Sequence, residues 1–175
     1  GDYGDKKIEV EALDKDKMDG LPGIVDGKAV KNKDYFILGG RSFSIYEVSG
    51  DSLNQVFDSG SDFEQKTAAY YPDYFNSNNK KNNVDNRSGK KGPEPESVVV
   101  GKVGDEFYAY IGLERIGGMM VYKITNPDAA TFVDYINTRN FEESFPEDNT
   151  PNLAQGDIAP EGMCTIPAKD SPTGY

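Results

Sequence analysis

Histidine is absent from the 175 residues, and cysteine occurs once, as Cys164. Hydrolysis by a Ser-His-Asp triad or a Cys-His pair requires a histidine, and a structural zinc site requires four cysteine or histidine ligands. The composition therefore excludes these sites, and it excludes a disulfide within the chain. No apolar run approaches the roughly 20 residues of a membrane-spanning helix, so we expect no transmembrane segment.

Basic residues are also scarce relative to acidic ones. Lysine and arginine number 19 against 30 aspartates and glutamates, which gives a formal net charge of −11. Because binding to a phosphate backbone requires a basic face, we expect no nucleic-acid partner. The chemistry that remains uses carboxylate, amide and hydroxyl oxygens, which are the ligands of hard cations such as calcium.

Short segments rich in Val, Ile, Tyr and Phe alternate with Gly, Pro, Asn and Asp, a pattern typical of β-strands. The segments occur in two similar series, 35–39, 43–48 and 53–57, then 108–112, 119–124 and 131–136. Gly39 and Gly112 are 73 residues apart, and Tyr46 and Tyr122 are 76 apart. Repeated meanders favour an all-β fold built of four-stranded β-propeller blades. A β-sandwich also has short strands but does not predict the internal match.

A whole propeller needs about four to eight blades of about 40 to 45 residues. Residues 1–175 are therefore expected to form a partial propeller of about two blades plus inserts, with the remaining blades of the parent chain as partners. The expected order is a last strand at 7–13, a blade at 23–57, an insert at 58–95, a blade at 96–136, an insert at 137–160, and the first strand of a third blade within 161–175.

Strand alternation places both inserts and the turns at 39–42 and 113–118 on one face. In the first insert, the sequence Ser61-Asp-Phe-Glu64 resembles a capping box and predicts a short helix at 63–71. Residues 76–89 are rich in side-chain oxygens and include Asp85, which indicates either a calcium loop or a polar turn. They also contain the glycosylation sequence Asn86-Arg-Ser88, which carries little meaning in a bacterial product.

Glu96 and Glu161 each follow a proline and begin the innermost strand of a blade. Their carboxylates are expected near the mouth of the central channel, where they could hold a cation together with Glu94, Asp157 and Asp85. The alternative is that each Pro-Glu pair only caps the entrance of a strand. Arg41, Glu114 and Arg115 are expected on the same loop-rich face, and Glu114 with Arg115 could equally form an ion pair that locks a turn.

Several stretches resemble a known family, the choice-of-anchor I domain and the related mesenchyme-specific cell-surface glycoproteins. They include Gly92-Pro-Glu-Pro-Glu96, Tyr110-Ile-Gly-Leu-Glu-Arg-Ile-Gly-Gly118 and Gly156-Asp-Ile-Ala-Pro-Glu-Gly162. The resemblance implies a larger β-propeller, export to the cell surface or the medium, and, in the animal proteins, a link to calcium mineral. Its bacterial members are often labelled alkaline-phosphatase-like, and the family fixes no catalytic residue.

Two functions of different classes follow. The first is a secreted or cell-surface binding module, associated with calcium, that presents its loop-rich face to a partner or polymer. The second is a calcium-dependent phosphoesterase, in which Arg41, Arg115 and Lys91 would contact the phosphate. An extracellular or cell-surface location, in a bacterium, is expected for either function.

Overall fold

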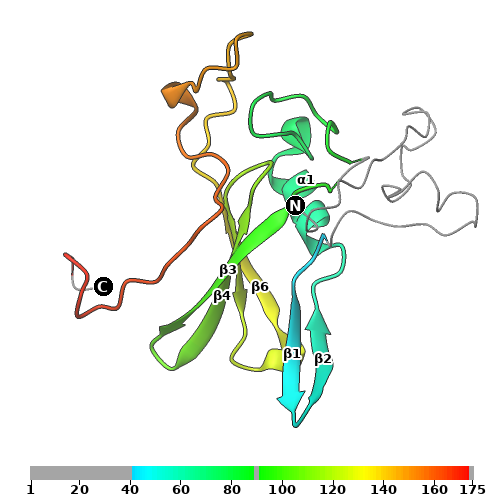
Figure 1. Ribbon diagram of the computed structural model, residues 1–175, viewed down its shortest axis with the longest axis vertical. Coiled ribbons are helices and arrows are strands. Elements are labelled where there is room, and N and C mark those ends of the chain that lie inside the picture. Colours follow the sequence, from blue (N-terminus) through cyan, green and yellow to red (C-terminus); the bar gives the residue numbers. More distant parts are fainter. Residues whose placement is uncertain (1–40, 89–90, 174–175) are drawn as a thin grey trace, which may run out of the picture.

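The computed structural model describes residues 41–88 and 91–173, and it is built mainly of two antiparallel sheets with little helix (Figure 1). Strands β1 (Ser44–Ser49) and β2 (Ser52–Asp58) form a two-stranded sheet. Strands β3 (Pro95–Val103), β4 (Glu106–Leu113), β5 (Met119–Lys123) and β6 (Thr131–Ile136) form a four-stranded sheet in that order. The all-β expectation is confirmed. Closure into a propeller stays a prediction, since the described residues form no closed barrel.

The four-stranded sheet is a simple meander whose strands follow one another in sequence and in space. A two-residue turn joins β3 to β4, where Gly104 has a φ of +61°, a conformation that glycine adopts without a steric cost. Between β4 and β5, a Cβ on Gly118 would lie 2.6 Å from the carbonyl oxygen of Ile136. The register of the sheet at this turn therefore depends on a position without a side chain.

Helix α1 (Asp62–Tyr70) and the 3₁₀ turn η3 (Pro72–Tyr74) cover one face of this sheet. Alternate residues of β4 point to this face, and all three of Ala109, Ile111 and Leu113 are buried. Phe63 of the helix and Tyr122 of β5 are completely buried there, with ring centroids 6.0 Å apart. Burial of large apolar side chains on one face gives the sheet its core.

The helix lies where the sequence predicts it, but the predicted capping box does not form. The N-cap residue Ser61 makes no capping hydrogen bond through its side chain. Glu64, which would complete the box, instead accepts hydrogen bonds from Arg41 (2.6 Å) and Asn76 (3.0 Å). A charged guanidinium offers the carboxylate a stronger hydrogen bond than a backbone amide does, so the tertiary contact replaces the local one.

The strand predicted within 161–175 is a second difference, because residues 161–173 contain no strand. A strand needs a neighbour for its backbone hydrogen bonds, and the four-stranded sheet ends at β3 and β6. The segment crosses the sheet instead, where an added Cβ on Gly112 would lie 3.2 Å from the carbonyl oxygen of Pro160. The strands predicted at 7–13 and 35–39, and the first part of the blade predicted at 23–57, lie outside the described residues.

Candidate functional site

The long connections of the chain meet at one end of the four-stranded sheet (Figure 1). The amide of Glu114, in the turn between β4 and β5, donates to the carbonyl of Glu94 at 2.9 Å. Arg139, which follows β6, donates to the carbonyl of Arg115 at 3.2 Å. Asn82, from the first insert, donates to the carbonyl of Glu143 in the second insert at 2.7 Å. Three segments that are distant in the sequence therefore form one loop-rich end.

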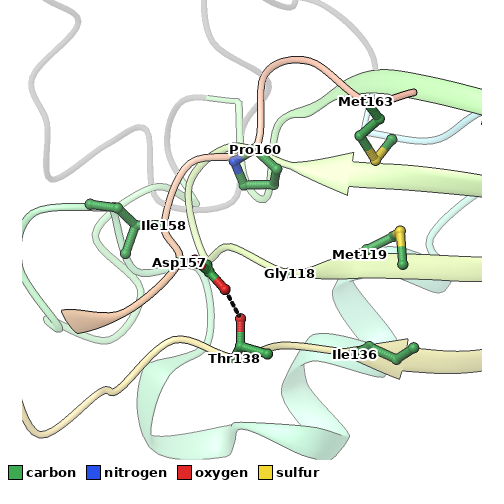
Figure 2. Close-up of a pocket in the computed structure, with 8 residues that line it drawn as sticks. All are labelled: Gly118, Met119, Ile136, Thr138, Asp157, Ile158, Pro160 and Met163. Carbon is green, nitrogen blue, oxygen red and sulfur yellow. Dashed lines mark hydrogen bonds between the residues drawn. The ribbon is translucent and has the colours of Figure 1, made fainter. Parts of the chain in front are cut away.

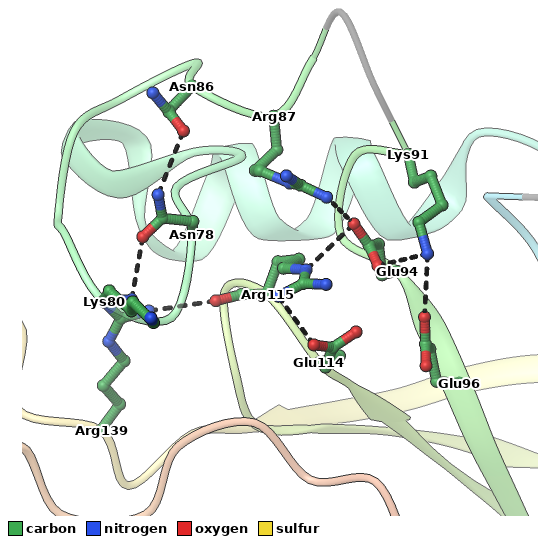
Figure 3. A network of polar contacts seen from close by, with 10 residues as sticks. All are labelled: Asn78, Lys80, Asn86, Arg87, Lys91, Glu94, Glu96, Glu114, Arg115 and Arg139. Atoms are coloured by element: carbon green, nitrogen blue, oxygen red, sulfur yellow. Dashed lines mark hydrogen bonds and ion pairs between the residues drawn. The ribbon is translucent and has the colours of Figure 1, made fainter. Parts of the chain in front are cut away.

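Glu94 is the centre of a charged cluster at this end (Figure 3). Its side chain is only 1% exposed. Its Oε1 forms ion pairs with the guanidinium of Arg87 and with Nε of Arg115, the latter at 3.0 Å. Its Oε2 lies 2.8 Å from Lys91 Nζ. Two further carboxylates complete the cluster: Glu96 lies 3.2 Å from Lys91 Nζ, and Glu114 lies 2.7 Å from Arg115 Nη1. We call these six residues the Glu94 cluster: Arg87, Lys91, Glu94, Glu96, Glu114 and Arg115.

The backbone at Glu94 is held in an unusual conformation, with a φ of +53°. Residues other than glycine adopt this region rarely and at an energetic cost. Two hydrogen bonds hold the segment, from the amide of Glu114 to the carbonyl of Glu94 and from the amide of Arg115 to the carbonyl of Pro93 at 3.3 Å. The turn between β4 and β5 thus fixes the position of the Glu94 carboxylate.

The two buried carboxylates of the cluster have opposite pKa shifts. Burial opposes the ionisation of Glu94, but hydrogen bonds from Arg115, Lys91 and Arg87 outweigh it and hold the pKa of Glu94 well below its usual range. Burial raises the pKa of Glu114 to about 7; Arg115 opposes the shift, and the negative charges of Glu96 and Glu94 add to it. The cationic neighbours of Glu94 therefore stabilise its ionised form fully, whereas those of Glu114 do not offset its burial and the nearby negative charges.

The cluster also contains the one group of three acidic residues, among the residues that the structure describes, that could hold a metal ion. One oxygen each of Glu94, Glu96 and Glu114 lies within 4.8 Å of the others. Carboxylate oxygens suit calcium. Both oxygens of Glu94 already pair with cationic side chains, however, so a calcium ion would compete with Lys91 for Glu94 and Glu96.

Not all of the residues expected to hold calcium come together. Asp85 accepts a hydrogen bond from the hydroxyl of Ser88, and Asp157 accepts one from Thr138 at 2.9 Å. Glu161 is exposed on the segment that crosses the sheet. None of these three belongs to the acidic group. Glu161 lies elsewhere because residues 161–173 do not form the strand that would have placed it beside Glu96.

Arg41, Glu114 and Arg115 were expected on the loop-rich face. Glu114 and Arg115 lie in the Glu94 cluster as an ion pair. Arg41 instead donates to Glu64 at 2.6 Å and to the carbonyl of Ser88 at 2.5 Å. These bonds join α1 to the end of residues 76–88, which we call the Asn-rich loop.

Arg139 is a buried residue that the sequence analysis did not single out. It is 5% exposed, donates to Asn82 Oδ1 at 2.5 Å and to the carbonyls of Arg115 and Ile116, and its guanidinium lies over the ring of Phe141. Burial lowers the pKa of Arg139 to about 10. Through these hydrogen bonds Arg139, in the second insert, connects Asn82 of the first insert to the turn between β4 and β5. No local spacing signals this role, because its partners are up to 57 residues away.

An apolar groove of about 270 Å³ lies beside the same end of the sheet (Figure 2). Met119 of β5 and Ile136 at the end of β6 line it, together with Pro160 and Met163 from the C-terminal part of the chain. The bond between Thr138 and Asp157 joins the two sides. The turn between β4 and β5 thus supplies Gly118 to the groove and Glu114 and Arg115 to the Glu94 cluster.

A model of the choice-of-anchor I domain matches residues 8–127. The chain belongs to the choice-of-anchor I domain family. The family match expected from the sequence motifs is thus confirmed, and the matched region includes β1 to β5 and the whole Glu94 cluster. No solved structure matches the chain.

Two curated relatives cover parts of this choice-of-anchor I chain. Gigasin-3a from Magallana gigas is 38% identical over 93 residues, which are 50% of this chain and 32% of Gigasin-3a. The mesenchyme-specific cell surface glycoprotein from Strongylocentrotus purpuratus is 29% identical over 100 residues, 51% of this chain and 13% of that protein. The chain thus spans less than a third of either relative. Both are animal proteins, so the expected bacterial origin receives no support.

The helices of the described segments are too short and too polar to cross a membrane. The longest of them, α1, has nine residues.

Proposed function

We propose that this choice-of-anchor I chain is part of an extracellular or cell-surface binding module, and that its loop-rich end contacts a partner or polymer. The supporting observation is the gathering of both inserts and the turn between β4 and β5 at one end of a rigid sheet. Loops fixed on a rigid scaffold are where binding residues concentrate. One relative is named as a cell surface glycoprotein, which supports the location.

The location is tested on the parent protein in its source cells, by fractionation and by protease treatment of intact cells. We expect the protein in the medium, or on the cell surface where the protease removes it. A protein that is found only inside intact cells, protected from the protease, would contradict the proposal.

The meander of β3 to β6 is proposed to be one blade of a propeller that the parent chain completes. Val98 and Val100 of β3 pair with Ile111 and Ala109 and share their face of the sheet. That face is buried on β4, yet Val98 is 62% exposed and Val100 is 51% exposed. Another blade packed on this edge would remove the exposed apolar surface from water.

This packing is tested in the parent protein with Val98→Asp, compared with Leu153→Asp as the control. Leu153, the first residue of the 3₁₀ turn η5 (Leu153–Gln155), is 92% exposed, so its replacement should leave the melting temperature unchanged. If a blade covers β3, Val98→Asp buries a charge and lowers the melting temperature by several degrees. Equal melting temperatures for both variants would show that Val98 stays in contact with water.

Calcium association is a further proposal, and the Glu94 cluster is the place to test it. Because Lys91 Nζ lies 2.8 Å from Glu94 and 3.2 Å from Glu96, Lys91→Met removes the cation that calcium must displace. Calorimetry of the parent protein should then show tighter calcium binding. Lys102→Met is the matched control, because Lys102 lies on β3 beside Phe107 and outside the cluster. Unchanged binding in Lys91→Met, or no binding in any variant, would remove calcium from this site.

The phosphoesterase alternative has less support. It requires carboxylates around more than one metal ion, with cationic side chains available to the phosphate. The described residues supply one group of three carboxylates, and its cations already pair with those carboxylates. We therefore favour the binding module.

A further inference from the structure

Asn86, Arg87 and Ser88 form an acceptor sequence for N-linked glycosylation, an asparagine followed at the second position by serine or threonine without an intervening proline. No other asparagine in the 175 residues meets this rule. For example, Asn149 is followed by Thr150 and then by Pro151. The sequence thus limits the modification to one residue.

The structure places Asn86 where a glycan can be accommodated. It is exposed, and it lies in a turn outside every helix and strand. Two asparagines of the same insert differ, since Asn76 is completely buried and Asn82 binds the second insert through its amide nitrogen. A bulky glycan on Asn86 therefore displaces no packed side chain.

The orientation of the Asn86 amide also favours glycosylation. Its Oδ1 accepts a hydrogen bond from Asn78 Nδ2 at 3.1 Å. The opposite atom, Nδ2, is turned away from Asn78 (Figure 3), and within the described structure it donates to no residue. Nδ2 is the atom that forms the bond to the sugar, so the loop already holds this side chain with its reactive atom outward.

We propose that Asn86 carries an N-linked glycan when this chain passes through a eukaryotic secretory pathway. In the transfer, Asn86 Nδ2 forms a bond to the anomeric carbon of an oligosaccharide carried on a polyisoprenyl diphosphate. The bond from that carbon to the phosphate oxygen breaks, the lipid diphosphate leaves with the electron pair, and Nδ2 loses one proton. The inference rests on the proposed extracellular function, because the modification occurs only on exported chains.

A glycan at this position would lie beside the Glu94 cluster. Arg87, the next residue, pairs with Glu94 at the centre of the cluster. The glycan would therefore border the loop-rich end and restrict the directions from which a macromolecular partner can approach it. It would leave the apolar groove accessible, since the Asn-rich loop contributes no residue to its lining.

The test uses the parent protein secreted from animal cells behind a heterologous signal sequence. Peptide N-glycosidase treatment in heavy-oxygen water converts a glycosylated Asn86 to labelled aspartate, which mass spectrometry of the peptide detects without any variant. We expect the label at Asn86 and a loss of mass of the whole protein. Secreted protein with an unmodified Asn86 would overturn the proposal.

Three variants sharpen the result. Asn86→Gln should remove the glycan, whereas Ser88→Thr should keep it because threonine also completes the acceptor sequence. Asn83→Gln is the matched control, since Asn83 is exposed in the same loop and lies outside the acceptor sequence. A glycan that persists in Asn86→Gln would place the modification elsewhere and overturn the assignment.

The heterologous signal separates this proposal from the proposed function. Fractionation of the source cells tests the natural location, and the secreted protein tests the acceptor site. Glycosylation of the secreted protein together with an intracellular natural location would refute the proposed function alone. An unmodified secreted protein together with an extracellular natural location would refute the glycan alone.

Discussion

The four-stranded sheet is buried in two different ways, under α1 by aromatic side chains and at its loop-rich end by polar and charged ones. Phe63 and Tyr122 are completely buried in the first region, and Glu94 (2% exposed) and Gln155 (0% exposed) are buried in the second. Apolar burial is favourable for almost any side chain that fills the space. Burial of charge is favourable only when every group finds a partner. The comparison indicates that the aromatic region provides stability and the polar region fixes the positions of the loops.

The largest expected effect is in the aromatic region. Phe63→Ala should lower the free energy of unfolding by about 3–5 kcal/mol, because it removes a fully buried ring that contacts Phe43 and Tyr122. Chemical denaturation of the protein measures the loss. Leu53→Ala is the control, since Leu53 is 68% exposed. Equal losses for both variants would show that the aromatic region is not the core.

A smaller effect is expected at the centre of the polar region. Glu94→Gln keeps the size of the side chain but leaves Arg87, Lys91 and Arg115 without their shared anion. Leaving buried donors without partners should cost about 1–3 kcal/mol of unfolding free energy. Faster hydrogen exchange confined to the first insert and the turn at 114–118 would show that the cluster holds the loops together.

The control for Glu94→Gln is Glu106→Gln, which alters a half-exposed carboxylate on β4. It should leave hydrogen exchange in the inserts unchanged. If Glu94→Gln also leaves hydrogen exchange in the inserts unchanged, the Glu94 cluster does not hold the loop-rich end together.

The pH dependence of stability gives a third, smaller difference. Because the pKa of Glu114 rises from its usual 4.5 to about 7, the folded protein binds more protons than the unfolded chain between these pH values. The unfolding free energy contributed by Glu114 is therefore present below pH 4.5 and is lost as the pH rises toward 7. The pKa of Glu94 is lowered, so its contribution has the opposite pH dependence: it is present above the usual pKa of a glutamate and is lost as the pH falls below that value.

Denaturation at pH 4.5 and at pH 7 separates these contributions. In Glu114→Gln, the unfolding free energy should fall less between pH 4.5 and pH 7 than it does in the wild type. Glu161→Gln, which removes an exposed carboxylate, should keep the full decline. A decline that survives in Glu114→Gln would assign it to another group.

The smallest effect is expected at an ion pair outside both regions. Lys123 and Glu106 lie 2.8 Å apart, but their side chains are 41% and 40% exposed. Water and salt screen such pairs. Lys123→Met should therefore leave the melting temperature within error of the wild type at moderate salt. A shift comparable to that of Glu94→Gln would mean that exposure does not distinguish the two ion-pair networks.

Much of the strand order was predictable because it depends on local periodicity. The alternation in β4 and the glycines of the turn at 117–118 are visible in the sequence, and the observed strands lie where these signals occur. Strand alternation also predicted that Glu94 and Glu114 lie on one face, but it did not predict how closely they approach. The sequence did not predict which charges pair, because Arg87 and Arg139 reach their partners only through tertiary contacts.

Two of the predictions that differ from the described structure depended on a local motif. The capping box at Ser61 was replaced when Glu64 bound Arg41, 23 residues away. The Pro-Glu pair at 160–161 resembles the pair that begins β3, yet residues 161–173 form no strand. A motif predicts a conformation only where its long-range partners permit it.

The sequence by itself determined the strand-rich character, the family, the excluded chemistries and the single acceptor asparagine, because each depends on residue type or short spacing. The tertiary structure decided which charges meet, which carboxylate is buried and which amide faces outward. Those properties depend on distances between residues far apart in the chain, and Glu94 acquires its three cationic partners only when the first insert folds back onto the turn between β4 and β5.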